Sequence, residues 1–313
     1  MDIYLAPLEG ITGYAYRNAV HQCFGGYDKY FIPFIRAKQN LRFSSRETKD
    51  ILPDNNKGMY AVPQILTRNA EDFLNTARQI REFGYNEINL NLGCPSKTVV
   101  SKGCGSGFLS EPEELDRFLE KIFSGFDGRI SIKTRIGVED AEDFPVLMDI
   151  YNKYPLKELI IHARVQKDFY KNTPNLDVFQ AALQNSKNPV CYNGDIFTEA
   201  DYRKFHSRFP EVDRIMTGRG VLANPALARE IKGGPSLTKE ELQKFHDVIY
   251  SSYCENMSGD RNVLFKMKEL WFYMAPMLTE SKKYAKKIKK CERCTVYENI
   301  VKEFFLSQSL III

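Results

Sequence analysis

The stretch EINLNLGCPSK, residues 87–97, sets the pattern from which we predict the fold. Its first seven residues are rich in apolar side chains and read as a strand, which the glycine, cysteine and proline that follow bring to an end. A helix-length mixture of polar and apolar residues follows many such runs in this chain. The stretch therefore predicts one βα unit of a parallel sheet, with polar side chains at the carboxyl end of its strand.

This unit recurs along the first 220 residues. Strands are predicted at 3–7, 30–35, 60–66, 87–93, 130–137, 158–164, 189–194 and 213–220, with helices between them such as 70–83 and 112–124. Eight units in about 230 residues match a (β/α)8 TIM barrel, which typically needs about 250. An open, doubly wound sheet is the alternative fold. It is less favoured because no glycine-rich dinucleotide fingerprint follows the first strand.

The pattern changes after Gly233-Gly234-Pro235. Residues 238–256, 261–277 and 292–308 have apolar positions at helical spacing, and no strand is predicted among them. We therefore expect a catalytic barrel domain over residues 1–234 and a small all-helical C-terminal domain over residues 235–313.

Composition places the chain among globular proteins. Of its 313 residues 43% are hydrophobic and 27% charged, which excludes collagen-like and largely disordered chains. No apolar run approaches the ~20 residues of a membrane span, and the first residues do not resemble a signal peptide. We expect a cytoplasmic monomer without a membrane segment. No metal site is predicted, because the spacing of Cys291 and Cys294 lacks a second ligand pair.

Polar residues stand at the ends of seven of the eight predicted strands. They are Pro7-Leu8-Glu9, Gln64, Asn89 with Asn91 and Cys94, Lys133 with Arg135, His162 with Arg164, Asn193-Gly194-Asp195, and Gly218-Arg219-Gly220. Any one of them could simply cap a helix or satisfy a loop. Because the carboxyl ends of barrel strands form one mouth, their recurrence indicates an active site there.

Two of these strand ends suggest particular chemistry. The glycines after the seventh and eighth strands, with Arg219, suit a phosphate group, which barrels often bind at these two loops. Cys94 follows the fourth strand, between a glycine and a proline. A thiol of ordinary pKa, about 8.5, stays mostly protonated at neutral pH and could donate a proton. The alternative for Cys94 is a small buried apolar side chain.

With these residues in place, the chain resembles the dihydrouridine synthase family, flavoenzymes that reduce specific uridines in RNA. The resemblance covers nearly the whole length. Its motifs are Ala6–Thr12, Gln64, Asn91–Ser96, Lys133–Gly137, His162–Arg164, Tyr192–Ile196 and Thr217–Gly220.

The resemblance implies a bound FMN, NADPH as reductant and tRNA as substrate. The residues it assigns to FMN are Pro7, Leu8, Glu9, Gln64, Lys133, His162, Asn193, Gly194, Asp195, Gly218 and Arg219. It implies that hydride passes from flavin N5 to C6 of uridine while Cys94 gives a proton to C5, forming 5,6-dihydrouridine. Asn91, Arg135 and Arg164 are the residues it places toward the substrate.

Charge is concentrated near the end of the chain. Residues 1–234 hold 31 basic and 30 acidic residues, whereas residues 282–293 hold seven basic residues and one acidic residue. A lysine run is usually a solvated helix face. Beside a barrel of this family we predict instead that Lys286, Lys287 and Lys290 bind RNA phosphates.

Two other functions are compatible with parts of the sequence. A small-molecule flavin oxidoreductase of the dihydroorotate or dihydropyrimidine dehydrogenase type would share the barrel and FMN, but has no need of the basic segment. A non-catalytic RNA-binding barrel would not need Cys94, Lys133 and His162. The sequence leaves open which uridine is modified, whether NADPH or NADH is preferred, and whether Cys104 has a role.

Overall fold

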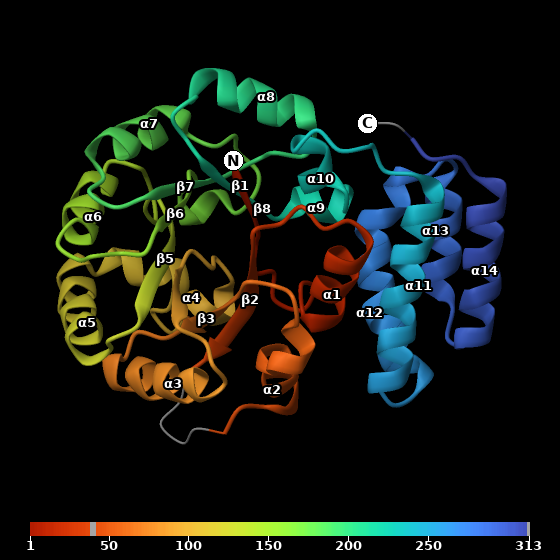
Figure 1. The fold of residues 1–313 in the computed structure, drawn as a ribbon, viewed down its shortest axis with the longest axis horizontal. Helices are drawn as coiled ribbons and strands as arrows, with labels where there is room; N and C mark the ends of the chain where they lie inside the picture. The colour runs from red at the N-terminus through yellow and green to blue at the C-terminus, as the bar shows by residue number, and fades with distance from the viewer. Residues whose placement is uncertain (38–41, 312–313) are drawn as a thin grey trace. The chain divides into compact units, whose positions relative to one another are not determined.

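The computed structural model describes residues 1–37 and 42–311. Eight parallel strands close into a barrel in chain order, as Figure 1 shows. The strands are β1 (Asp2–Leu5), β2 (Lys29–Arg36), β3 (Ala61–Leu66), β4 (Glu87–Leu92), β5 (Arg129–Arg135), β6 (Leu159–His162), β7 (Val190–Asn193) and β8 (Arg214–Thr217). All eight predicted strands are present, so the TIM barrel is confirmed and the open sheet is wrong.

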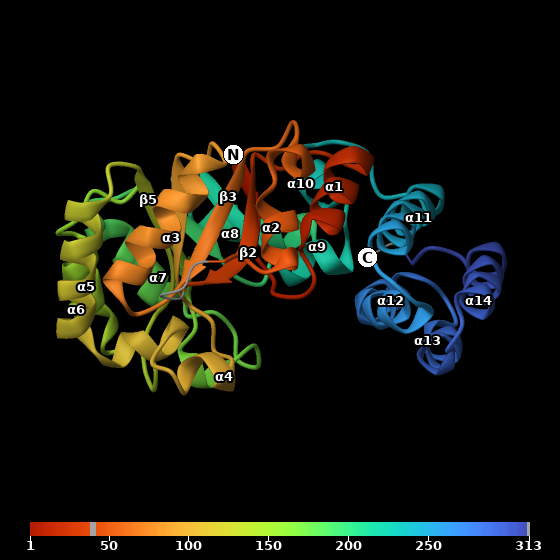
Figure 2. The ribbon, with the colours of Figure 1, turned by 90° about the horizontal axis from the view of Figure 1, so that it is seen from below.

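Helices follow the strands and then continue alone to the end of the chain (Figures 1 and 2). They are α1 (Tyr14–Cys23), α2 (Ser45–Ile51), α3 (Ala70–Glu82), α4 (Lys97–Val100), α5 (Pro112–Gly125), α6 (Phe144–Tyr151), α7 (Leu176–Asn185), α8 (Glu199–Arg208), α9 (Arg219–Ala223), α10 (Leu227–Ile231), α11 (Lys239–Asn256), α12 (Asp260–Met274), α13 (Ser281–Lys290) and α14 (Cys294–Ser307). Short 3₁₀ turns are η1 (Pro53–Asn56), η2 (Gly105–Ser110), η3 (Gln166–Asp168) and η4 (Ala275–Met277). In the part of the chain that is described, no helix combines the length and the apolarity that crossing a membrane requires.

Some element ends differ from the sequence prediction for local reasons. The helix predicted over 261–277 stops at Met274 and continues as the turn η4, because Pro276 has no N–H to donate and disrupts the α-helix. The strand predicted to reach residue 220 ends at Thr217, because α9 begins at Arg219. The separate helix α13 holds most of the lysine-rich segment.

The chain divides into two compact units. The first comprises residues 1–7, 28–195 and 209–216, and it contains all of the barrel strands except the last residue of β8. The second comprises residues 8–27, 196–208 and 217–313. A domain boundary at residue 234 stays a prediction, since the second unit also includes α1 and α8–α10.

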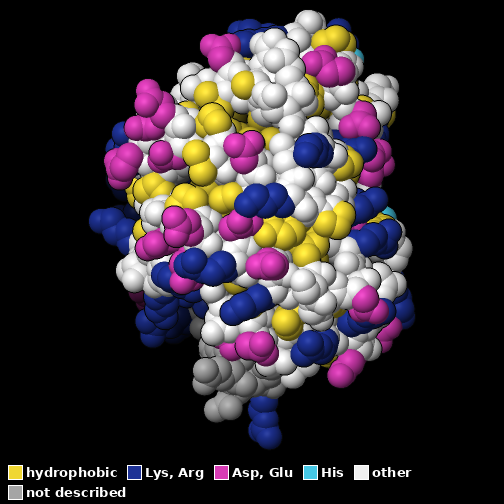
Figure 3. Space-filling view, turned by 90° about the vertical axis from the view of Figure 1, so that its left-hand side faces the viewer, with side chains coloured by type: hydrophobic (Ala, Val, Ile, Leu, Met, Phe, Trp, Pro, Cys, Tyr) yellow, Lys and Arg dark blue, Asp and Glu magenta, His cyan; other side chains and the backbone are white. Residues whose placement is uncertain are grey.

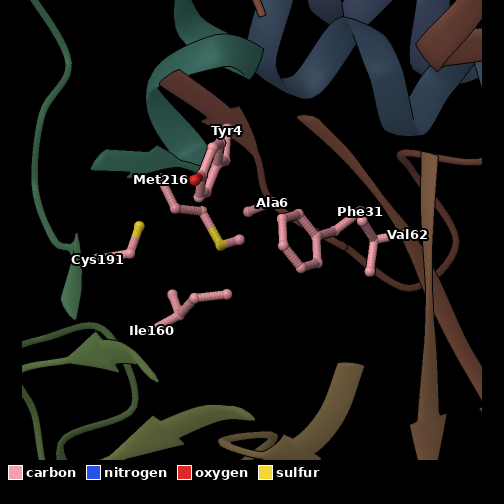
Figure 4. Packing of buried hydrophobic residues seen from close by; sticks show 7 residues of the cluster. All are labelled: Tyr4, Ala6, Phe31, Val62, Ile160, Cys191 and Met216. Atoms are coloured by element: carbon pink, nitrogen blue, oxygen red, sulfur yellow. The ribbon is translucent and has the colours of Figure 1, made fainter. Parts of the chain in front are cut away.

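The interior of the barrel is filled by side chains. Figure 4 shows seven of them pointing toward one another from different strands and their ends: Tyr4, Ala6, Phe31, Val62, Ile160, Cys191 and Met216. Each is at most 3% exposed. This packing leaves no pore, so chemistry must take place at the strand ends rather than inside the barrel.

The amino-terminal ends of the strands hold a buried ion network. Lys29 Nζ lies 3.0 Å from a Glu87 carboxylate oxygen and 2.7 Å from one of Glu158. The hydroxyls of Tyr60 and Tyr4 donate to the same two carboxylates. One ammonium is therefore shared between two buried acids, one at the start of β4 and the other directly before β6.

The C-terminal helices pack around an aromatic core. Trp271 Nε1 of α12 donates to the Tyr297 hydroxyl of α14 over 2.7 Å, and His246 of α11 contacts the same hydroxyl through Nε2. Tyr284 of α13 stacks on Phe304 of α14 with ring centroids 4.3 Å apart. These contacts hold α11–α14 together as a helical bundle.

Candidate active site

Strand register places the predicted site residues of the first unit side by side. Asn91 of β4 pairs with Lys133 of β5, and Arg135 pairs with His162, which in turn pairs with Asn193 of β7. Gln64 of β3 pairs with Asn89 of β4. Because parallel strands present their carboxyl ends at one edge, these side chains share the same mouth of the barrel.

Buried amides form a ladder across β3, β4 and β5. Gln64 Nε2 donates to Asn89 Oδ1, Asn91 Nδ2 donates to Gln64 Oε1, each over 2.7 Å, and Asn89 Nδ2 donates to Ser131 Oγ over 2.9 Å. Gln64 and Asn89 are fully buried. The ladder therefore fixes the orientation of the Gln64 amide, whose nitrogen and oxygen each keep capacity for one further hydrogen bond.

The loop that carries Cys94 is held on both sides. Asn91 Oδ1 accepts from the N–H groups of Gly93 and Cys94, over 3.1 and 3.0 Å. The Cys94 carbonyl accepts from the Ser106 N–H and from Ser106 Oγ. A side chain at Gly105, where φ is +59°, would meet the Cys94 carbonyl oxygen at 2.7 Å. Cys94 is therefore fixed in place, partly exposed, by residues on two sides of its loop.

Lys133 combines partial burial with a charge that no acid neutralises. Among residues 1–37 and 42–311 its ammonium takes part in no salt bridge. Burial, reinforced by the charge of Arg135, lowers the pKa of Lys133 from 10.5 to about 8. An unneutralised ammonium at a strand end suits a ligand that carries or develops negative charge.

Arg135 is buried and bonded to the backbone of two loops. Its guanidinium donates to the carbonyls of Gly93, Val165 and Phe169 over 3.0, 2.8 and 2.7 Å. Tyr170 lies against the same guanidinium, 5.5 Å from ring centroid to Cζ. The arginine thus joins the Cys94 loop to the loop after β6, a positioning role that the sequence alone did not indicate.

Arg164 and Asp195 form a bidentate ion pair. Arg164 Nη1 lies 3.0 Å from Asp195 Oδ1, and Nη2 bonds to Oδ2. Nη1 also contacts His162 Nε2 over 3.1 Å. A guanidinium has no acceptor, so Nε2 accepts, and the neutral ring carries its proton on Nδ1. The Asp195 carboxylate is engaged by Arg164, so its contribution to an anion site would come from its backbone.

The loop after β7 keeps its backbone close to neighbouring groups. Asn193 Nδ2 donates to the Met216 carbonyl of β8 over 2.8 Å. A side chain at Gly194 would collide with the Tyr192 hydroxyl. These residues leave little room for anything but glycine at position 194.

In the second unit, the predicted phosphate residues stand at the start of α9. Gly218 is the N-cap of this helix and Arg219 its first residue. The Arg219 guanidinium lies 5.3 Å from the centroid of the Phe197 ring. A side chain at Gly220 would meet the Ile196 carbonyl oxygen at 2.1 Å, so this glycine lets α9 pack tightly against the segment before α8.

The loop after β1 belongs mostly to the second unit. Pro7 is the last residue of the first segment of the first unit, and the second unit begins with Leu8 and Glu9. The Leu8 N–H donates to Thr12 Oγ1 over 2.8 Å, and Glu9 is exposed. Lys266 Nζ of α12 donates to the Gly10 carbonyl over 2.6 Å, which ties this loop to the C-terminal helices.

The three lysines predicted to bind RNA differ in their surroundings. Lys286 and Lys290 are exposed on α13. Lys287 Nζ lies 3.0 Å from Glu303 Oε2 of α14 and 5.0 Å from the centroid of the Tyr284 ring. On the face of the molecule seen in Figure 3, basic and acidic side chains are mixed. Lys286 and Lys290 are thus better placed than Lys287 to contact a polyanion.

Two residues of the site escaped the sequence analysis. Ser106 holds the Cys94 carbonyl and bonds to Gln166 Oε1 over 3.1 Å, and Ser131 ends the amide ladder. Ser106 lies in the segment Gly103–Gly107, whose glycines predict a tight loop but do not indicate which residue Ser106 contacts. Ser131 lies within a strand, and the alternation of side chains along a strand indicates only that Ser131 points inward.

The polar groups of the first unit fit a planar, hydrogen-bonding cofactor that gains negative charge when it is reduced, such as a flavin. Lys133 offers an ammonium without an acid partner, and Gln64 offers a fixed amide. The fold and these strand ends define an α/β-barrel enzyme.

The comparisons with known proteins identify the family. The model described as dihydrouridine synthase (Dus) matches residues 4–308, so the chain belongs to this family. The family implies a flavin cofactor and a tRNA substrate.

Two proteins named as tRNA-dihydrouridine(16) synthases are similar to this chain. A tRNA-dihydrouridine(16) synthase of Cupriavidus necator is 30% identical over 238 residues, which cover 74% of this chain and 73% of the relative. One of Neisseria meningitidis serogroup B is 25% identical over 315 aligned positions, which cover 96% of this chain and 94% of the relative. Among solved structures, a morphinone reductase shares the fold, with a TM-score of 0.54 at 12% identity over 78% of this chain and 90% of that one.

Proposed function

We propose that this protein is a tRNA-dihydrouridine synthase, which reduces the C5=C6 bond of specific uridines in tRNA to 5,6-dihydrouridine. FMN is the proposed cofactor and NADPH the proposed reductant. The observation that carries the proposal is the placement of Cys94 on a loop fixed by Asn91, whose strand neighbour is the partly buried Lys133, an ammonium without a salt bridge among the described residues.

Within the first unit, Gln64, Lys133, His162, Asn193 and Gly194 would hold the flavin, together with Pro7, two residues after β1. The flavin, when bound, supplies the hydride that reaches C6 of uracil. Lys133 would stabilise negative charge on the ring beside it, because its ammonium has no acid partner to compete. Leu8, Glu9, Gly218 and Arg219 stay predictions from the family resemblance, as does a phosphate contact through the Asp195 backbone.

Cys94 would act as the general acid. When C6 gains hydride, the electron pair of the C5=C6 bond moves onto C5 and the C4 carbonyl oxygen. The Cys94 S–H bond then breaks, its proton forms the new C5–H bond, and the thiolate regains a proton from solvent. Asn91 and Ser106 fix the thiol by binding the backbone of its loop.

Arg135 and Arg164 have less freedom to bind substrate than the sequence suggested. Their guanidinium groups already donate hydrogen bonds to loop carbonyls and to Asp195. We propose that both act on the substrate indirectly, by holding the loops around it.

A small-molecule pyrimidine dehydrogenase is the second candidate. The exposed lysines of α13 favour the RNA enzyme over it, because a free base needs no polycation.

The test is conversion of uridine to dihydrouridine in unmodified tRNA, with NADPH, by purified protein loaded with FMN. The wild type should form dihydrouridine, and Cys94→Ala should keep the flavin spectrum but lose at least 100-fold in turnover. Cys104→Ala, which alters the second thiol of the same loop region, serves as the matched control and should stay active. Full activity of Cys94→Ala would overturn the acid assignment, and faster turnover of free uracil or orotate than of tRNA would favour the dehydrogenase.

A further inference from the structure

Helix α12 carries aromatic side chains on its outer surface that the core does not explain. Phe265 is 67% exposed and Phe272 is 75% exposed. The opposite face of the helix already supplies the apolar contacts that hold it in the bundle, through Val263, Leu264, Met267, Leu270, Trp271 and Met274. Exposing two large rings is unfavourable in water, so this outer face is a candidate binding surface.

The exposed rings alternate with cations. Arg261, Phe265, Lys268 and Phe272 follow one another at spacings of four, three and four residues, which places all four on one side of an α-helix. We call these four residues the α12 stripe. Arg261 is exposed and Lys268 is partly exposed. An alternation of ring and cation presents stacking surfaces at the same place as positive charge.

The α12 stripe adjoins the basic segment of the helical bundle. Lys268 Nζ donates to the carbonyl of Cys291, the residue after α13, over 2.6 Å. Residues 260–293, which contain both helices, hold ten basic and four acidic residues. The partner of the stripe must therefore be a polyanion that also offers flat apolar faces.

Helix α12 is also tied to the loop after β1, through a residue outside the α12 stripe. Lys266, next to Phe265, donates to the Gly10 carbonyl. Leu8 and Glu9, which the family resemblance assigns to the flavin, belong to this same loop. Helix α12 therefore contacts a loop that holds two of the residues predicted to bind the flavin.

We propose that the α12 stripe binds unpaired nucleotides of the tRNA, with bases stacked on Phe265 and Phe272 and phosphates paired with Arg261 and Lys268. This inference rests on the proposed function and specifies how its substrate is held. Single-stranded nucleic acid is recognised by this combination, because every base has an aromatic face and every linkage carries a charge. A folded tRNA contains unpaired loop nucleotides, and a target uridine that leaves its stack frees its neighbours to stack elsewhere.

The experiment compares tRNA affinity in stripe variants. In Phe265→Ala/Phe272→Ala, the Kd for unmodified tRNA should rise at least tenfold, since each base stacked on an aromatic ring contributes that order of affinity. The NADPH oxidation rate without RNA should not change. Phe265→Trp/Phe272→Trp should bind like the wild type, because indole also stacks. Arg261→Ala should reduce the salt dependence of binding by about one ion, whereas the alanine pair should leave it unchanged.

Leu306→Ala is the matched control, because Leu306 of α14 is also 75% exposed and belongs to the same bundle. It should bind tRNA like the wild type, and circular dichroism would confirm that all variants are folded. The proposal is overturned if the alanine pair binds and modifies tRNA like an active wild type. It is equally overturned if light scattering shows that the pair abolishes a dimer while tRNA affinity is kept, since the stripe would then join two copies of the chain. An inactive wild type would instead contradict the proposed function itself.

Discussion

Lys133 shows how one residue can be tuned by its surroundings. Its ammonium is charged below its pKa and neutral above it, and burial brings that pKa down to about 8. The charge proposed to assist the flavin is therefore lost as pH rises through about 8, rather than through 10.5 as for an exposed lysine.

FMN affinity should follow this titration. As pH rises from 7 to 9, the Kd of the apoprotein for FMN should increase by up to about tenfold, because a charge-assisted hydrogen bond is replaced by a neutral one. Flavin fluorescence quenching would measure it. Lys133→Arg keeps its charge and should show no such rise, and an equally steep rise in Lys133→Met would show that another group is responsible.

Arg135 tests whether a buried arginine positions loops or binds substrate. Arg135→Lys replaces three forked hydrogen bonds with at most one, so buried carbonyls lose partners. We expect a loss of about 2–4 kcal/mol in the free energy of unfolding, measured with urea, together with reduced turnover. Arg129→Lys, an exposed change at the other end of β5, should have no effect. Unchanged stability with weakened tRNA binding would restore the substrate-binding role.

At the scale of elements, α13 has two kinds of lysine. Lys287 joins α13 to α14 through Glu303 and lies over Tyr284, whereas Lys286 and Lys290 extend from the exposed side. The same residue type therefore supports packing at one position and is available to RNA at the others.

Reversing the exposed charges should weaken RNA binding specifically. Lys286→Glu/Lys290→Glu should raise the Kd for tRNA more than tenfold and make binding less dependent on salt, because phosphate contacts release fewer ions. A filter-binding titration over several salt concentrations would measure both. Lys187→Glu/Lys204→Glu changes the net charge equally at exposed positions elsewhere. Equal losses in the two variants would mean that only net charge matters.

At the scale of the whole molecule, the two ends of the barrel have different tasks. The carboxyl ends of the strands hold the candidate site, and the amino ends hold Lys29 between Glu87 and Glu158. That network contributes to stability and lies away from the proposed chemistry.

Lys29→Met would remove the cation that bonds directly to two buried carboxylates. We expect a loss of about 3–5 kcal/mol in the free energy of unfolding, because an uncompensated buried charge costs more than the pair contributes. Chemical denaturation would measure it, and flavin binding by the remaining folded protein should persist. Lys57→Met removes a lysine paired with Asp54 at the surface and should change little. A near-wild-type stability for Lys29→Met would mean that the carboxylates accept protons without cost.

The sequence alone predicted where the strands lie and which residues stand at their ends. That was possible because apolar periodicity and strand-ending glycines and prolines are local properties of the chain. The register then brought Asn91 beside Lys133, and Arg135 beside His162 and Asn193, as a closed parallel barrel requires.

Only the tertiary structure decided what several of these residues do. Arg135 bonds to carbonyls as far as 42 residues away, Ser106 holds the loop of Cys94, and Arg164 engages Asp195. A hydrogen bond between distant loops depends on the path of the whole chain, which no local pattern encodes. The sequence could not predict the exposure of Phe265 and Phe272 for the same reason. Whether an apolar residue of a helix is buried depends on which elements pack against that helix.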